Sequence, residues 1–270
     1  MAAFPPTLRH LLLFLTATFT PVAARAGDWR DTLTPNCGNF PNLRPLTAHY
    51  EFGWSGFKAA EADAIFSKKG GRLQLETRGG TTGPARALWR MDARATSTCS
   101  PTTLHPVKLQ QTETYSGGKS LTTTVDFTDD GPAYLRVPSP PDPTEPKVKH
   151  FKFADVHDLH SALLFIRSQP LRNGDIVRLC VFPANSPYLA EVAVLRRETI
   201  RVAGKKWNAI RCDLRLQSVQ KDFTLQPHKR FKRATAWISD DADRLLLKLD
   251  AEIFVGHIWL ELDRVEFASK

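Results

Sequence analysis

The chain has 270 residues, of which 42% are hydrophobic and 24% are charged, and its formal net charge is +9. This balance is typical of a globular protein and excludes a wholly disordered chain. No internal apolar run approaches the roughly 20 residues that a membrane-spanning helix needs. The length fits one large all-β domain or two small domains.

Residues 1–26 have the pattern of a secretory signal peptide. Arg9 precedes the short apolar run at residues 11–15, and Ala24, Arg25 and Ala26 form a small-x-small cleavage site. We expect cleavage after Ala26, which leaves a periplasmic or secreted chain without a transmembrane segment. A disordered N-terminus and an uncleaved anchor are the alternatives.

From Pro45 onward, apolar and polar residues mostly alternate, which is typical of β-strands. We expect residues 27–44 to form an extended segment and residues 45–267 to form a single β domain. Strands are expected at residues 47–54, 57–67, 72–78, 88–98, 107–115, 120–127, 176–182, 189–202, 206–216, 234–239, 244–255 and 257–267. This predicts a mainly β fold, a large antiparallel sheet curled into a barrel, half-barrel or spiral, with one short helix packed on it.

Residues 138–149 interrupt the strand pattern with five prolines. Proline lacks a backbone donor, so we expect this Pro-rich segment to be a loop outside the sheet.

Residues 155–168 form the one strong helix candidate. Asp155 is the expected N-cap, and Leu159, Leu163 and Ile166 recur with the spacing of one helical face. We expect this face to pack on the mouth or concave side of the curled sheet, so that the helix acts as a plug or lid.

All four cysteines follow the predicted cleavage site, and an even number in an exported protein suggests disulfide bonds. A meander of the strands at 176–182, 189–202 and 206–216 would separate Cys180 from Cys212 by two strand spacings, roughly 9.6 Å, beyond the roughly 7 Å limit for a disulfide. Cys37 with Cys99 is therefore the preferred pair, and the state of Cys180 and Cys212 stays open. Buried free thiols are the alternative.

Several segments, in this order, resemble the DUF3108 family of exported bacterial proteins of unknown function. They are Tyr-Glu-Phe-Gly-Trp-Ser-Gly at 50–56, the stretches at 158–167 and 171–175, Gly-Lys-Lys-Trp-Asn-Ala at 204–209, and Ala-Trp-Ile-Ser-Asp-Asp at 236–241 with 251–253 and Gly256. The chain departs from the pattern at Ala60 or Ala62, where Gly is expected, and it lacks a Pro near residues 246–247. The resemblance implies an envelope protein with a curled antiparallel sheet, similar in outline to periplasmic lipoprotein carriers. It supplies no catalytic residue.

The sequence contains no G-x-S-x-G nucleophile motif and no zinc-ligand spacing. We therefore expect a protein that is not an enzyme and has no cofactor or metal. His157 and His160, beside Asp155 and Asp158, come nearest to a metal-binding set, but a solvated helix face accounts for them. The Asp-rich segment 240–243 lacks the Gly and Glu spacing of a calcium loop and is expected to be a hairpin turn.

Aromatic and basic residues supply the remaining candidates. Trp54, Trp237 and Trp259 are expected either to fill the core or, in an open barrel, to line a cavity for an acyl chain. A basic segment is a candidate contact for anionic lipid or polysaccharide, with a solvated edge strand as the alternative. It consists of Lys229, Arg230, Lys232 and Arg233. Export argues against nucleic acid as a partner.

The favoured hypothesis is an exported, non-enzymatic envelope protein that binds a hydrophobic or lipid-like ligand or scaffolds an envelope component. A structural or protein-interaction module without a small ligand is the alternative, and a cell-wall glycan hydrolase is less favoured. The ligand, partner proteins and oligomeric state stay open.

Overall fold

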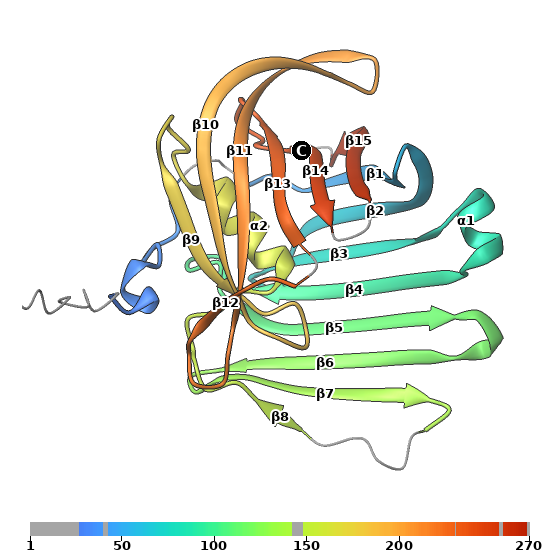
Figure 1. The fold of residues 1–270 in the computed structure, drawn as a ribbon. Coiled ribbons are helices and arrows are strands. Elements are labelled where there is room, and N and C mark those ends of the chain that lie inside the picture. Colours follow the sequence, from blue (N-terminus) through green and yellow to red (C-terminus); the bar gives the residue numbers. More distant parts are fainter. Residues whose placement is uncertain (1–26, 40–42, 142–147, 230, 254–255, 269–270) are drawn as a thin grey trace, which may run out of the picture. The chain divides into compact units, whose positions relative to one another are not determined.

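A computed structural model of the chain describes residues 27–39, 43–141, 148–229, 231–253 and 256–268 (Figure 1). The predicted signal peptide at 1–26 lies outside these residues. The chain divides into two units, residues 1–31 and residues 32–270. A short 3₁₀ helix, η1 (Trp29–Thr32), spans their boundary, and the fold described below is that of the second unit.

The described part of the second unit forms one antiparallel sheet of 15 strands, which confirms the predicted mainly β fold. The order is β8-β7-β6-β5-β4-β3-β2-β1-β15-β14-β13-β11-β10-β9, and β12 pairs with β11. The bounds are β1 (Leu46–Trp54), β2 (Phe57–Lys69), β3 (Arg72–Thr81), β4 (Met91–Cys99), β5 (Pro106–Tyr115), β6 (Ser120–Thr128), β7 (Gly131–Ser139), β8 (Lys149–His150), β9 (Ile176–Val181), β10 (Tyr188–Val202), β11 (Lys205–Val219), β12 (Leu225–Pro227), β13 (Phe231–Ser239), β14 (Leu246–Ile253) and β15 (His257–Phe267). A 3₁₀ turn, η2 (Ser116–Gly118), joins β5 to β6.

The sheet curls around helix α2 (Leu159–Ser168). In Figure 1, β2 to β7 lie side by side in one layer, whereas the long strands β10 and β11 bend across the opposite side of the helix. Helix α2 contacts β9 and β4, which lie far apart in the order of the sheet. The helix therefore lies inside the curl, between two distant parts of the sheet.

Leu164 and Phe165, neighbours on helix α2, contribute to two different hydrophobic clusters. Leu164 packs with buried side chains of β1, β2 and β3 and with Leu247 and Leu262. Phe165 packs with buried side chains of β9, β10, β11 and β13. The helix thus joins the two halves of the curled sheet, and the large apolar area that it buries stabilises both.

The predicted apolar face of the helix is wrong in part. The buried helical residues are Ser161, Ala162, Leu164, Phe165, Arg167 and Ser168. Leu159 is 62% exposed, and Leu163 and Ile166 are half-buried. The helix starts at Leu159 with Asp158 as its N-cap, so the predicted cap at Asp155 is three residues too early. A helix enclosed on several sides buries more than one stripe, and a single apolar stripe cannot describe it.

Besides the 3₁₀ helix η1, which lies in the segment expected to be extended, four elements were missed by the strand pattern. A second helix, α1 (Gly83–Leu88), has Pro84 in its first turn, where the missing N–H of proline costs nothing. The others are β7, β8 and β12. Pro138 lies within β7 opposite Leu121, although the Pro-rich segment was expected to be outside the sheet. It is tolerated because β8 pairs with β7 only at Ala133 and Tyr134, so this end of β7 is an edge.

All four cysteines are free thiols, and the preferred Cys37–Cys99 disulfide is not formed. Cys37 Sγ donates to the carbonyl oxygen of Thr102 instead, at 3.1 Å. The order β9-β10-β11 confirms the meander that separates Cys180 from Cys212. Burial raises the pKa of Cys99 and of Cys212 to about 12, so both thiols are protonated and unreactive at neutral pH.

Gly53 lies opposite Trp259 in the β1–β15 pair, and the indole ring covers it. A Cβ atom at this position would lie 2.0 Å from Trp259 Cε2. We expect Gly53→Ala to lower the free energy of unfolding by about 1–3 kcal/mol, the usual cost of overpacking. Chemical denaturation measures this. In a Trp259→Ala background the same substitution should cost much less, and an equal cost in both backgrounds would contradict the steric cause.

Candidate functional site

Asp158 fixes helix α2 to the sheet. Its Oδ1 atom accepts the backbone N–H of Ser161 at 2.8 Å, and its Oδ2 atom accepts the hydroxyl of Ser97, in β4, at 2.5 Å. All three residues are buried. The first turn of the helix is therefore held at a defined place on the inner face of the sheet.

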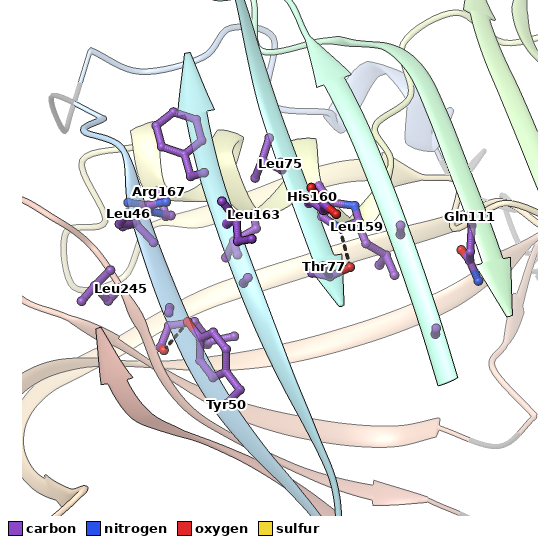
Figure 2. A pocket seen from close by; sticks show the side chains of 18 residues that line it. Leu46, Tyr50, Leu75, Thr77, Gln111, Leu159, His160, Leu163, Arg167 and Leu245 are labelled. Carbon is purple, nitrogen blue, oxygen red and sulfur yellow. Dashed lines mark hydrogen bonds between the residues drawn. The ribbon is translucent and has the colours of Figure 1, made fainter. Parts of the chain in front are cut away.

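One stripe of the helix runs along a cavity between α2 and the inner face of β1 to β5 (Figure 2). Leu159, Leu163 and Arg167 form this stripe, each one turn after the last. Leu159 is 62% exposed, Leu163 is half-buried and Arg167 is 5% exposed. The stripe therefore descends from an open end at Leu159 to a closed end at Arg167.

The cavity has a volume of about 350 Å³, within the range of roughly 300–1,000 Å³ that small-molecule sites occupy. Its walls are mostly apolar. They comprise Leu46, Ala48, Tyr50, Ala64, Ile65, Phe66, Leu75, Glu76, Thr77, Ala93, Ala95, Gln111, Leu159, His160, Leu163, Arg167, Leu245 and Leu246. Four of them are alanines on β1, β2 and β4. Short side chains on the inner face of a curled sheet leave space that larger residues would fill.

Two of the uncharged polar side chains of the wall, those of Tyr50 and His160, are titratable. The Tyr50 hydroxyl donates to the carbonyl oxygen of Leu246 at 3.0 Å, and burial raises the pKa of Tyr50 to about 12 (Figure 2). His160 Nε2 forms a hydrogen bond with the Thr77 hydroxyl at 3.1 Å. Burial lowers the pKa of His160, although the carboxylate of Asp158 opposes this shift. Neither group brings a charge into the cavity at neutral pH.

Two charged residues, Glu76 and Arg167, belong to the wall of the cavity, and Glu76 lies opposite Thr96 on the strand face that points away from the cavity. Glu76 forms ion pairs with Arg78 and Arg94, so its charge is balanced. Arg167 Nη2 donates to the carbonyl oxygen of Asp243 at 2.6 Å, and its Nε atom is buried without a hydrogen-bond partner. Burial lowers the pKa of Arg167, yet a guanidinium stays protonated at neutral pH.

A second group of polar side chains lies at the turn before the helix. His105, Asp155 and His157 each have one atom that can ligate a metal, and these three atoms lie within 4.8 Å of one another. Burial, helped by the nearby His105, lowers the pKa of His157 to about 3, so this imidazole is neutral. Neutral imidazoles with a carboxylate are ligands that zinc accepts. Among the described residues, this is the set closest to a metal site.

The structure separates most of the predicted site residues from the cavity. Leu159 and Leu163 line it, but Ile166 packs in the core with Phe165. Trp54, Trp237 and Trp259 are not among the lining residues. Trp54 is 50% exposed, Trp259 covers Gly53, and Trp237 Nε1 donates to Glu198 Oε1 at 2.7 Å. The three tryptophans therefore do not line this cavity, and Trp237 packs against the core, which is the other of the two expectations.

The predicted basic contact remains untested. Lys229 and Arg233 are exposed. Arg230 and the side chain of Lys232 lie outside the described part of the chain.

Arg167 was not among the predicted site residues, although it lies in the segment 158–167 that carries part of the family resemblance. Its position is one turn after Leu163 on the stripe that begins at Leu159, so a charged residue continues an apolar stripe. That departure from the pattern was the available signal. Tyr50 and the inward-facing alanines carry no comparable signal, because many strands contain such residues.

Residues 47–263 match the family described as "Protein of unknown function (DUF3108)". The chain belongs to the DUF3108 family. This DUF3108 chain matches none of the curated proteins. No helix among its described residues is long and apolar enough to cross a membrane.

The DUF3108 fold has a structural counterpart in the β-barrel-like protein of domain of unknown function DUF1849 from Brucella abortus. That protein is 11% identical, with a TM-score of 0.56, and the match covers 84% of this chain and 99% of the other. A candidate lipoprotein from Parabacteroides distasonis matches with 9% identity, a TM-score of 0.33, and 86% and 100% coverage. A candidate exported protein with a YmcC-like fold from Bacteroides fragilis matches with 8% identity, a TM-score of 0.37, and 85% and 99% coverage. Only the first is similar enough to show a shared fold.

Proposed function

We propose that this protein is an exported, non-enzymatic binding protein that holds the apolar part of a lipid-like ligand beneath helix α2. The observation that carries the proposal is the cavity of about 350 Å³, with apolar walls from Leu46, Phe66 and Leu75. Transfer of an acyl chain from water to such walls is favourable by about 0.8 kcal/mol for each buried methylene. The signal-peptide pattern at residues 1–26 supports export.

The test is native mass spectrometry of the mature protein, purified from its own periplasm without detergent and measured before and after organic extraction. A discrete bound mass that extracts as lipid is the expected result. A clean mass of the protein alone, together with failure to take up added lipid, would overturn the proposal.

Filling part of the cavity should weaken ligand binding without unfolding the sheet. Ala95 lines the cavity from β4, whereas the next residue, Thr96, points to the other face of the strand. We expect Ala95→Phe to weaken ligand binding at least tenfold, since even one methylene of misfit costs roughly 1–3 kcal/mol. Thr96→Phe is the matched control and should retain the bound mass. Equal binding by both variants would place the ligand elsewhere.

A protein-interaction module is the second candidate, favoured by exposed apolar side chains near one end of the sheet. Trp54, Phe57 and Ile258 are exposed on paired positions of β1, β2 and β15. Leu88 and Trp89 are exposed at the end of α1, which contacts β2. Apolar groups gathered on a surface are typical of contact sites. Crosslinking from Phe57 to an envelope protein, with no lipid bound, would favour this candidate.

A further inference from the structure

Arg167 is a cation at the closed end of the cavity, and the protein satisfies little of its hydrogen-bonding capacity. A guanidinium has five N–H donors. The described residues provide Arg167 with one hydrogen bond, from Nη2 to the carbonyl oxygen of Asp243. The Nε atom is buried and has no partner.

The acidic groups nearest to Arg167 are engaged elsewhere. The carboxylate of Asp243 accepts two hydrogen bonds from Arg44, both at 2.6 Å. Asp241 Oδ1 accepts the Ser239 hydroxyl and the backbone N–H groups of residues 243 and 244. Within the described part of the chain, no carboxylate forms a salt bridge with Arg167. A buried charge is unfavourable unless a partner of opposite charge balances it.

We propose that Arg167 binds the carboxylate of a single-chain amphiphile, whose tail occupies the apolar cavity towards Leu159. This inference rests on the proposed function and names its ligand class. One guanidinium balances one negative charge, and its planar donors match a carboxylate. The uncharged polar groups of the wall, Tyr50, Thr77, Gln111 and His160, bring no competing charge. The apolar side chains of the wall, among them Leu46 and Leu163, contact the tail.

The experiment compares dodecanoate with 1-dodecanol, which has the same chain but no charge. Both are titrated into the mature protein by calorimetry below their solubility limits. We expect dodecanoate to bind about 10- to 100-fold more tightly than the alcohol, because hydrogen bonds to a charged partner contribute this much. The carbon-13 signal of carboxyl-labelled dodecanoate should also titrate at lower pH in the complex than in water, since a neighbouring cation favours the carboxylate.

Arg167→Met keeps an unbranched apolar stem and removes the guanidinium with its charge. We expect this variant to bind the two ligands with similar affinity, through loss of dodecanoate binding alone. Arg264→Met removes an exposed guanidinium outside the cavity and should leave the preference unchanged. If Arg167→Met is unstable, the inference is still tested by the preference of the wild-type protein for dodecanoate over 1-dodecanol and by the titration of the dodecanoate carboxyl group.

Two results would overturn the inference in different ways. Equal affinity of the wild-type protein for dodecanoate and 1-dodecanol would show that the cavity binds chains but that Arg167 does not select the headgroup. Absence of binding by either ligand would refute the proposed function and this inference with it.

Discussion

Acidification from about pH 6.5 to pH 3 is expected to destabilise the protein through His157. This side chain is 1% exposed, neither ring nitrogen has a hydrogen-bond partner, and its pKa is lowered from 6.5 to about 3. Between these two values the unfolded chain binds a proton that the folded chain does not. The free energy of unfolding therefore falls as the pH falls through this window, and below about pH 3 the loss is complete. A shift of this size corresponds to roughly 3–5 kcal/mol.

Urea denaturation at pH 7 and at pH 4 measures this effect. His157→Phe keeps an aromatic ring against Phe165, which now stacks edge-on with the imidazole at 4.9 Å between ring centroids. Between pH 7 and pH 4, the free energy of unfolding should fall much less in His157→Phe than in the wild-type protein. The difference should be most of the roughly 3–5 kcal/mol attributed to His157. His150→Phe replaces an exposed histidine and should leave the pH dependence unchanged. A pH dependence that His157→Phe does not alter would show that the buried imidazole is not the cause.

The strands were largely predictable because the inner face of the sheet is buried and the outer face is not. Leu46, Ala48 and Tyr50 alternate with half-buried residues along β1, and this period of two is visible in the sequence. The turns at 128–131 and 240–243 were marked by Asp and Gly. In β7, by contrast, Pro132 and Pro138 concealed a strand that tolerates proline only because of its place near the edge of the sheet.

The cavity could not be predicted because it depends on which strands meet inside the curl. Ala64 and Ala93 are ordinary strand residues until β2, β4 and helix α2 enclose the same space. The tryptophans were candidates for the core or for an apolar wall, since they are the largest apolar side chains. A large side chain closes a cavity as readily as it lines one, and Trp259 instead packs across Gly53 on the neighbouring strand.

Removal of the Asp158 carboxylate is expected to lower the free energy of unfolding by about 2–4 kcal/mol. Loss of an N-cap costs about 0.5–2 kcal/mol, and loss of a buried hydrogen-bond acceptor leaves the partner donor unsatisfied at a cost of about 1–3 kcal/mol. Asp158→Ala causes both losses, because it leaves the Ser161 N–H and the Ser97 hydroxyl without their acceptor. Asp158→Asn keeps an oxygen for the cap and should be the milder variant. Thermal and urea denaturation rank the two.

Asp155→Ala tests the N-cap predicted from the sequence against Asp158, the N-cap in the structure. The sequence pattern favoured Asp155, whereas in the structure the helix begins three residues later and the Asp155 side chain is 48% exposed. Its replacement should change stability by less than about 0.5 kcal/mol, as is usual at exposed positions. If Asp155→Ala proved as destabilising as Asp158→Ala, the helix would begin a turn earlier than described. The residues from Leu159 to Arg167 would then lie at a different position over the cavity, because Asp158 sets the position of this stripe.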